Sequence, residues 1–319
     1  MEYKIPWWEP QVGGEEYDLL REVLDSNFLN DGDFTARFER ELSRRLGCKY
    51  VVALCNGTMA LFASLAGLGI GAGDEVIVPD ITFIATANAV TLTGARPVLV
   101  DVDAKTLTIE SAAAARAITS RTRAVIAVHV SGRAVEMDGI LELADKHGLY
   151  VIEDAAEALL SQRQGRCLGT LGAAGCFSFS PNKTIMCGQG GAAATDDEQL
   201  HRRLREIKDQ GRPVRGTGGD DIHDGIGFNF KLTNLQAAVG LGQLNLLEGR
   251  LKKLKQVYKS YREKLGEVEG VTFLGFDIDG GESPQWVDVL VEEPDELCQY
   301  LGGRGIECRR FWRPLHTQK

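Results

Sequence analysis

The sequence lacks the regularly spaced histidines and cysteines that mark metal sites and disulfide-stapled folds. Its five histidines are scattered, with no H-x-x-x-H pair, and its seven cysteines include no C-x-x-C pair. Structural zinc sites and small disulfide-rich domains depend on such spacings. We therefore expect no bound metal and reduced thiols, which is typical of the cytoplasm.

Long apolar runs and an excess of positive charge are also missing. No run reaches the roughly 20 residues of a membrane-spanning helix, and residues 1–14 contain Glu, Trp and Pro instead of a charged-then-apolar export signal. Lys and Arg number 36 against 45 Asp and Glu, which gives a net charge of −9. Such a chain offers no general electrostatic surface for nucleic acid or an anionic membrane. We expect a cytoplasmic protein with neither kind of partner.

Proline is scarce at 9 residues, whereas glycine is abundant at 37 and often lies at the ends of short apolar runs. The apolar residues in these runs are continuous instead of alternating, which is typical of strands buried on both faces. Seven strands are expected, at residues 50–54, 75–79, 97–101, 123–130, 149–153, 176–179 and 191–194.

Helix-length segments separate several of these strands, at residues 58–68, 111–117, 137–147 and 197–210. The repetition of strand and helix predicts an α/β domain with a mainly parallel, seven-stranded sheet. A long helix is expected over 235–267, and after it a small α/β unit with strands at 271–274, 286–291 and 306–311 and a helix at 294–301. We expect a large domain over 1–245 and a small, early-ending domain over 246–319. Residues 212–224 and 277–283 are expected to be exposed loops.

Lys183 is the first candidate for chemistry. It follows a short buried strand and lies on a loop whose next residues include Gly188, Gly190 and Gly191. An amine held in a desolvated site loses its proton more easily and can form an imine with a carbonyl group. A solvated surface lysine is the alternative.

An acidic pair supplies the second candidate. The predicted strand at 149–153 ends in Glu153 and Asp154, at the sheet edge where open α/β sheets bind ligands. A buried carboxylate there needs a cationic partner, and a protonated pyridine nitrogen is one such group. The alternative is a helix cap, with Asp154 as N-cap and Glu157 completing a capping box.

The third candidate is a strand-to-helix turn at Asn56, Gly57 and Thr58. Glycine permits a close backbone approach, the helix start presents free N–H groups, and the Thr58 hydroxyl can donate to a phosphate. Ser178, five residues before Lys183, can add a second hydroxyl. An imine lysine, a carboxylate for a pyridine nitrogen and a phosphate cradle are together the groups that pyridoxal phosphate requires.

Eight stretches of the sequence resemble one known family, the DegT/DnrJ/EryC1/StrS sugar aminotransferases. They are N-G-T-M-A-L (56–61), V-P-D-I-T-F-I-A-T-A-N-A-V (78–90), P-V-L-V-D-V-D (97–103), H-V-S-G-R-A-V-E-M-D (129–138), I-E-D-A-A-E-A-L (152–159), F-S-F-S-P-N-K-T (177–184), G-Q-G-G (188–191) and G-F-N-F-K-L-T-N-L-Q-A-A-V-G (227–240). The resemblance implies a fold type I, aspartate aminotransferase-like enzyme that uses pyridoxal 5'-phosphate. It also implies a homodimer with shared active sites.

The resemblance assigns cofactor roles to residues of this chain. Lys183 would hold pyridoxal phosphate as a Schiff base and shuttle protons, and Asp154 would pair with the pyridine nitrogen. The remaining cofactor contacts would be the phosphate ligands Gly57, Thr58 and Ser178, the stacking ring Phe83, Glu157 near the phenolic oxygen, and Asn229 from the partner subunit.

Several of these residues have ordinary structural alternatives. Phe83 could be a core aromatic, and Asn229 and Lys231 a loop cap and a solvated charge. Lys231 stands where the family pattern leads us to expect Arg, and Gln189 replaces the usual Glu. We expect Lys231 and His316 on the substrate side, with an exposed histidine near the end of the chain as the alternative for His316.

A lysine at position 183 favours transamination, since the family's dehydratases carry histidine there. L-glutamate would convert the cofactor to pyridoxamine 5'-phosphate, which would then aminate a nucleotide-linked keto sugar. The motifs look most like those of the GDP-perosamine synthases, which aminate GDP-4-keto-6-deoxymannose for O-antigen biosynthesis. The alternatives are an aminotransferase for dTDP- or UDP-linked 3- or 4-keto sugars, a cofactor-binding regulatory protein, and a dehydratase.

Overall fold

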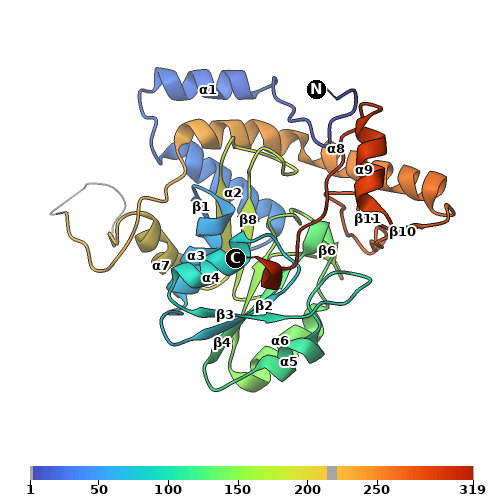
Figure 1. Cartoon of the computed structure of the whole chain (residues 1–319). Helices are drawn as coiled ribbons and strands as arrows, with labels where there is room; N and C mark the ends of the chain where they lie inside the picture. Colours follow the sequence, from blue (N-terminus) through green and yellow to red (C-terminus); the bar gives the residue numbers. More distant parts are fainter. Residues whose placement is uncertain (1–2, 214–220, 319) are drawn as a thin grey trace.

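The centre of the molecule is a seven-stranded sheet. The computed structural model describes residues 3–213 and 221–318, and Figure 1 shows the sheet surrounded by helices. The strand order is β1-β9-β8-β5-β4-β2-β3. The strands are β1 (Tyr50–Leu54), β2 (Glu75–Pro79), β3 (Arg96–Val100), β4 (Thr122–Val128), β5 (Tyr150–Asp154), β8 (Ala174–Ser178) and β9 (Gly191–Thr195).

Six of the seven strands run in one direction. The β3–β2, β2–β4, β4–β5 and β5–β8 pairs are parallel, whereas β9 is antiparallel to both of its neighbours, β8 and β1. This confirms the expected mainly parallel sheet of seven strands. The continuous apolar runs are explained by burial, since every residue of β2 and β9 is buried.

Helices cover both faces of the sheet. One face packs against α3 (Gly57–Gly67), α4 (Ala85–Leu92) and α7 (Glu198–Lys208). The other packs against α2 (Asp33–Leu46) and α8 (Asn234–Leu265) at one end and α5 (Ser111–Ala117) and α6 (Met137–His147) at the other. The result is a three-layer α/β/α domain with apolar clusters on both sides of the sheet.

The long helix expected over 235–267 is α8. Its start is fixed by a capping box, in which the Thr233 hydroxyl accepts from the Gln236 N–H and the Gln236 side chain returns to the Thr233 backbone. Leu241, Leu244 and Leu247 are buried against the sheet domain. Helix α1 (Glu16–Asp25) lies along α8 on the outside of the molecule (Figure 1).

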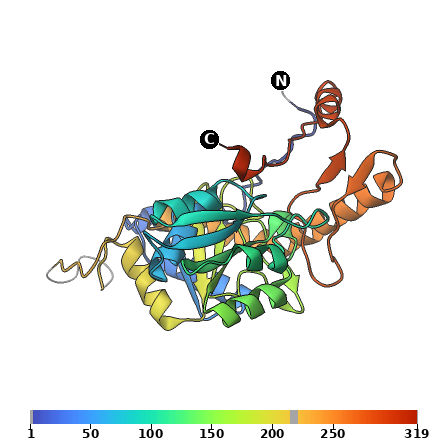
Figure 2. The same cartoon turned by 60° about the horizontal axis from the view of Figure 1, so that its bottom comes forward.

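A small unit projects from the sheet domain beyond α8 (Figure 2). It contains the antiparallel pair β10 (Val271–Phe273) and β11 (Val289–Val291), followed by α9 (Pro294–Gly302). The expected strand at 306–311 is wrong, because only Ile306 pairs, through a single bridge to Ile5 of the N-terminal segment. Residue 245 lies inside α8, and the division at 245/246 stays a prediction.

The remaining elements are short. A hairpin of β6 (Gln162–Arg163) and β7 (Arg166–Cys167) follows β5, and the 3-10 turns η1 (Val130–Gly132) and η2 (Leu315–Thr317) follow β4 and precede the end of the chain. Residues 277–283 form no helix or strand, as expected, but the expected exposure is wrong at Glu282 and Ser283, which are buried and hydrogen-bonded to the sheet domain. The other expected loop, 212–224, lies partly outside the described residues.

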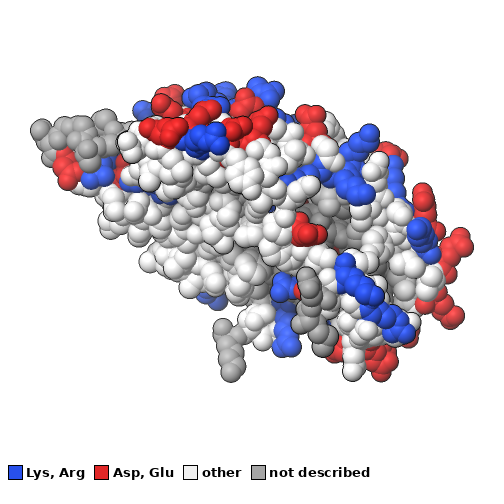
Figure 3. All heavy atoms as spheres, turned by 90° about the horizontal axis from the view of Figure 1, so that it is seen from above, with Lys and Arg blue, Asp and Glu red and all other residues white. Residues whose placement is uncertain are grey.

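Charges of both signs share the face that carries α1 and α8. Figure 3 shows acidic and basic side chains interspersed there. Among the described helices, none combines the length and the apolar character needed to cross a bilayer.

Candidate active site

The candidate residues meet where parallel strands end. Asn56 and Gly57 follow β1, Phe83 follows β2, Asp154 is the last residue of β5, and Lys183 lies in the loop after β8. The carboxyl ends of parallel strands share one edge of a sheet, which is where α/β folds bind their ligands.

The loop that carries Lys183 is closed by backbone hydrogen bonds. The Phe179 N–H donates to the Gly190 carbonyl at 2.8 Å, and the Cys187 N–H donates to the Phe179 carbonyl at 2.9 Å. Within the loop the Lys183 N–H donates to the Ser180 carbonyl at 3.0 Å, with Pro181 as the second residue of the turn. Proline fixes φ at this position, so the turn holds the lysine backbone in place.

The Lys183 amine lies against the Glu157 carboxylate. Its Nζ is 3.1 Å from Glu157 Oε1, and both side chains are largely buried. Glu157 Oε1 also accepts from the Trp286 indole N–H at 3.1 Å, and Oε2 accepts from the Ser131 N–H at 3.0 Å. Glu157 therefore orients the amine and is itself held by two further donors.

Asp154 is a buried carboxylate with few donors. Its Oδ2 accepts from the Thr86 hydroxyl at 2.7 Å, and its Oδ1 accepts from the Ala156 N–H at 3.2 Å. Burial raises the pKa of Asp154 above its ordinary value, although these hydrogen bonds and the Lys183 charge oppose the shift. The helix-cap alternative is wrong, because residues 155–160 form turns and no helix begins there.

The preceding residue, Glu153, has the opposite environment. It points to the other side of β5, where it contacts His129 Nε2 at 2.9 Å and accepts from the N–H groups of Gly169 at 2.8 Å and Gly172 at 2.7 Å. Burial alone would raise the pKa of Glu153, but the bonds from His129 and these N–H groups outweigh it and lower the pKa. The hydrogen bonds to Glu153 therefore stabilise its charge within the protein, whereas the charge of Asp154 would gain from an additional cation.

The turn before α3 forms a cradle that depends on glycine. Asn56 caps the helix by accepting from the Met59 N–H at 2.9 Å. A Cβ on Gly57 would lie 2.9 Å from Ser178 Cβ, and one on Gly191 would lie 2.3 Å from the Asn56 carbonyl carbon. The close approach brings Gly57, Thr58 and Ser178 together at a helix N-terminus, which favours an anion.

Phe83, Asn229, Lys231 and His316 have other partners than Lys183, Glu157 and Asp154. The Phe83 ring is 56% exposed and 6.3 Å from the Trp312 ring. Exposed Asn229 forms a backbone bridge with Asp209, and the Lys231 amine also pairs with Asp209. The exposed His316 bonds the Asp80 carboxylate through both its backbone N–H and its ring. Their expected roles toward cofactor and substrate stay predictions.

Four residues that sequence reasoning did not assign also belong to this centre. Thr86 and Ser131 lie within the quoted family stretches, so their position after strands was a usable signal. Gln285 and Trp286 gave no such signal, because they lie in the small unit, far along the chain from the strands that carry the other residues. The Gln285 N–H donates to the Ser131 carbonyl at 2.8 Å, and its side chain donates to the Asn182 carbonyl at 3.2 Å.

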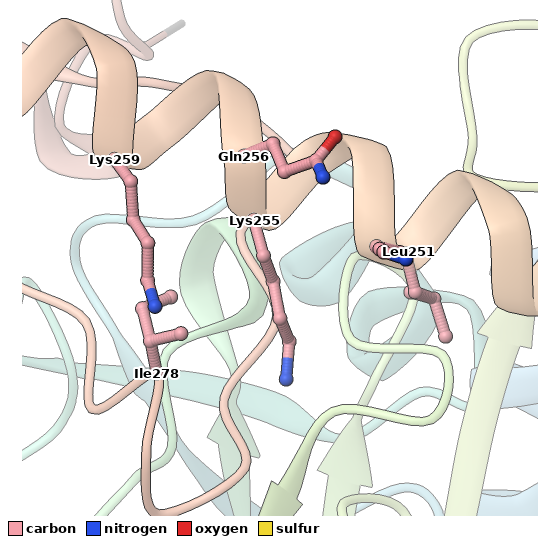
Figure 4. A pocket seen from close by; sticks show the side chains of 6 residues that line it. Leu251, Lys255, Gln256, Lys259 and Ile278 are labelled. Carbon is pink, nitrogen blue, oxygen red and sulfur yellow. The ribbon is translucent and has the colours of Figure 1, made fainter.

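A separate hollow lies beside α8. It has a volume of about 400 Å³ and is lined by Leu251, Lys252, Lys255, Gln256, Lys259 and Ile278. Figure 4 shows Lys255 and Lys259 extending from α8, with Ile278 close to Lys259. This lining contains no acid or hydroxyl, and none of its residues belongs to the cluster around Lys183.

Comparisons with known proteins agree on one family. The model of the DegT/DnrJ/EryC1/StrS aminotransferase family matches residues 10–319. The chain is 38% identical over 314 residues to GDP-perosamine synthase of Caulobacter vibrioides, covering 96% of this chain and 84% of that protein.

Solved structures with the same fold include two that carry bound molecules. S. venezuelae DesV in complex with a ketimine intermediate has a TM-score of 0.90 at 35% identity, covering 95% of this chain and 81% of that chain. DesI in the presence of its TDP-sugar product has a TM-score of 0.91 at 31% identity, and the match covers 100% of this chain and 82% of the DesI chain. These likenesses confirm the expected fold class.

Proposed function

Because the chain belongs to the DegT/DnrJ/EryC1/StrS aminotransferase family, we propose that it transfers the amino group of L-glutamate to the C4 keto group of GDP-4-keto-6-deoxymannose. Family membership makes the protein a pyridoxal phosphate-dependent sugar aminotransferase. The similarity to GDP-perosamine synthase supports the finer choice of sugar. The product would serve the biosynthesis of O-antigen or another surface polysaccharide, in the cytoplasm.

The side chains around Lys183 fit the cofactor. A buried carboxylate whose pKa is raised by desolvation gains most from a cationic partner, and Asp154 would meet a pyridine nitrogen in this way. Gly57, Thr58 and Ser178 would hold the phosphate at the start of α3, Phe83 would cover the ring, and Lys183 would bind the aldehyde carbon. When bound, pyridoxal phosphate supplies an electron-poor ring that stabilises negative charge next to the amino nitrogen.

The protein's own groups would then move the proton. Once its amine is free, Lys183 would take the proton from the donor carbon that loses the amino group and return it to the carbon on the cofactor side of the nitrogen. In the second half-reaction it would move a proton the opposite way, from that cofactor carbon to the sugar carbon that gains the amino group. Glu157 Oε1, at 3.1 Å from Nζ, sets the direction of the amine. Gln285 and Trp286 reach Ser131, Asn182 and Glu157 from the small unit, and would there limit the access of water.

A second copy of the chain would complete the site through Asn229. Apolar side chains near this residue favour such a dimer, since Ile226 is 87% exposed and Phe228 is 37% exposed. The observation that carries the proposed chemistry is the cluster of Lys183, Glu157 and buried Asp154 at one edge of the sheet.

A TDP-linked keto sugar is the second candidate substrate. The likeness to DesI, solved with its TDP-sugar product, favours it. The sugar and the nucleotide are chosen by loops around the centre, and position 231, where lysine replaces an expected arginine, is one place at which the choice could differ.

The test has two stages, beginning with the amino donor. Purified protein loaded with pyridoxal phosphate should absorb visible light, and L-glutamate should bleach that band. Lys183→Ala should abolish both the band and turnover, whereas Lys146→Ala, an exposed lysine on α6, should retain both. Bound cofactor that glutamate never bleaches would refute glutamate as donor.

The second stage identifies the substrate. Glutamate-treated protein is mixed with GDP-, dTDP- and UDP-linked keto sugars, and amino-sugar formation is measured by mass spectrometry. We expect the highest kcat/KM for GDP-4-keto-6-deoxymannose. A higher value for a dTDP-linked sugar would replace the first candidate with the second.

A further inference from the structure

One oxygen of Glu157 is shared between the two regions of the molecule. Glu157 Oε1 accepts from Lys183 Nζ, in the sheet domain, and from Trp286 Nε1, in the small unit, at 3.1 Å each. Asp154 is the other charged group in this cluster, since it interacts electrostatically with both Lys183 and Glu157. The direction of the lysine amine thus depends on a carboxylate oxygen that the Trp286 indole N–H also holds.

Trp286 is in turn held by the N-terminal segment. The Trp7 ring stacks on it, with centroids 4.6 Å apart and planes 18° from parallel. The Arg309 guanidinium lies over the Trp7 ring, 4.6 Å from its centroid. Stacked aromatic rings and a cation over an aromatic face each favour one fixed orientation.

The segment that carries Trp7 is itself attached to the small unit. The Trp7 N–H donates to the Glu307 carboxylate at 3.0 Å, and Ile5 exchanges backbone hydrogen bonds with Gly305 at 3.0 Å and Glu307 at 2.9 Å. Trp7 is therefore fixed at its backbone and its ring, and both attachments aim the Trp286 indole.

We propose that Trp286 is a positioning residue for Lys183, acting through Glu157, and that Trp7 holds Trp286 in the required orientation. The inference rests on the proposed aminotransferase function. That reaction uses the lysine twice, once to hold the cofactor and once as a free amine that moves a proton. When the amine leaves Glu157, the indole N–H keeps Oε1 hydrogen-bonded, so this oxygen does not go unpaired while buried, and with the Ser131 N–H on Oε2 the carboxylate keeps its orientation.

Trp286→Phe tests this directly, because phenylalanine keeps an aromatic ring for Trp7 but loses the N–H, together with the second ring of the indole. In cofactor-loaded protein, the visible absorbance band changes with pH. We expect the pH at which this change is half complete, the pH midpoint, to move by about 0.5 unit or more. The single-turnover rate with glutamate should fall about tenfold, the size expected for one hydrogen bond to a charged group, with the half-saturating glutamate concentration within twofold.

Matched variants separate positioning from stability. Trp7→Ala should shift the midpoint and slow the rate in the same direction but less, and Trp7→Phe should lie close to wild type. Trp8→Phe, on the neighbouring tryptophan that meets Trp7 edge-on, should change neither. All four variants are compared by melting temperature as well.

The outcomes distinguish this inference from the proposed function. A Trp286→Phe protein with an unaltered pH midpoint and rate overturns the positioning role, whatever its melting temperature. A shifted midpoint in protein that glutamate fails to bleach supports the role of Trp286, while it refutes glutamate as donor.

Discussion

The sheet domain and the small unit are built differently. The sheet domain contains three clusters of buried apolar residues on the two faces of its strands. In the small unit, by contrast, α9 buries none of its nine residues. The groups proposed to hold the cofactor therefore lie on a densely packed framework, whereas Gln285 and Trp286 come from a region with little core of its own. We infer that the second region can move with less cost than the first.

Each region nevertheless has a buried ionic anchor. In the sheet domain, Glu39 accepts from Arg205 at 2.6 Å, from Lys208 at 3.4 Å and from the Ala53 N–H of β1 at 2.8 Å. In the small unit, Asp288 accepts from Arg133 at 2.9 Å. The first anchor adds to a large apolar core, while the second is a principal attachment of its unit.

The largest expected effect concerns Asp154. Asp154→Asn removes the charge that would pair with the pyridine nitrogen, and we expect turnover to fall by about 100- to 10,000-fold, a range typical of catalytic groups. Burial raises the pKa of Asp154, so the folded state binds its proton more tightly than the unfolded chain. The carboxylate then destabilises cofactor-free protein above the raised pKa and ceases to do so as the pH falls through it.

The same variant should therefore melt higher than wild type without cofactor at pH 8, and the difference should shrink toward acidic pH. Differential scanning calorimetry across pH checks this. An asparagine variant that melts lower than wild type at pH 8 would contradict the assignment of Asp154 as a buried charge whose partners do not offset its desolvation.

The second prediction concerns the anchor of the small unit. Arg133 is 1% exposed, donates to the Gly275 carbonyl at 3.1 Å and lies 4.1 Å from the Phe276 ring centroid, in addition to its bond to Asp288. Arg133→Met leaves these acceptors unpaired, and we expect a loss of about 3–5 kcal/mol in local stability. Hydrogen exchange should accelerate over 271–291 while β4 and β5 stay protected.

A matched control is available in the same unit. Arg310 and Asp295 also form an arginine–carboxylate pair, at 2.8 Å, but with side chains 56% and 89% exposed. Arg310→Met should change stability by less than about 1 kcal/mol. Equal exchange rates in the two variants would remove the distinction between anchor and surface pair.

The smallest expected effect is the response of the sheet-domain anchor to acid. Burial opposes ionisation of Glu39, but Lys208 and Arg205 outweigh it and lower the pKa of Glu39 below its ordinary value. The stabilisation by ionised Glu39 is fully present at pH values above the ordinary pKa of a glutamate. It is lost as the pH falls through the lowered pKa of Glu39 in the folded protein. Glu39→Gln should reduce the slope of stability against pH in this acid range by at most about 1.4 kcal/mol per pH unit. Urea unfolding between pH 3 and 6 measures this, and an unchanged slope would contradict it.

Sequence reasoning predicted the sheet well because buried parallel strands appear in the sequence as continuous apolar runs bounded by glycines. It did not predict α1, α2 or α4. In α2 the signal was present, since Phe34, Phe38, Leu42 and Leu46 recur every four residues. The expected strand at 306–311 failed because its pairing needed Ile5, a partner that no local pattern identifies.

The candidate site divides in the same way. Lys183, Asp154 and the turn at Gly57 follow strands that the sequence makes visible, so topology alone brings them to one edge. Trp286 reaches Glu157 from 129 positions away in the chain, and only the packed structure brings them together. Local chemistry is readable from the sequence, whereas contacts between regions are not.

The attachment of Trp7 to Glu307 spans 300 positions of the chain. At a synthesis rate of about 5–20 residues per second, the N-terminal segment waits roughly 15–60 s for its partner to be made. The sheet and its clustered acid and lysine can form during that time. A newborn molecule would thus form the sheet edge with Lys183 and Asp154 first and gain the indole support of its lysine only after residue 307 has been made.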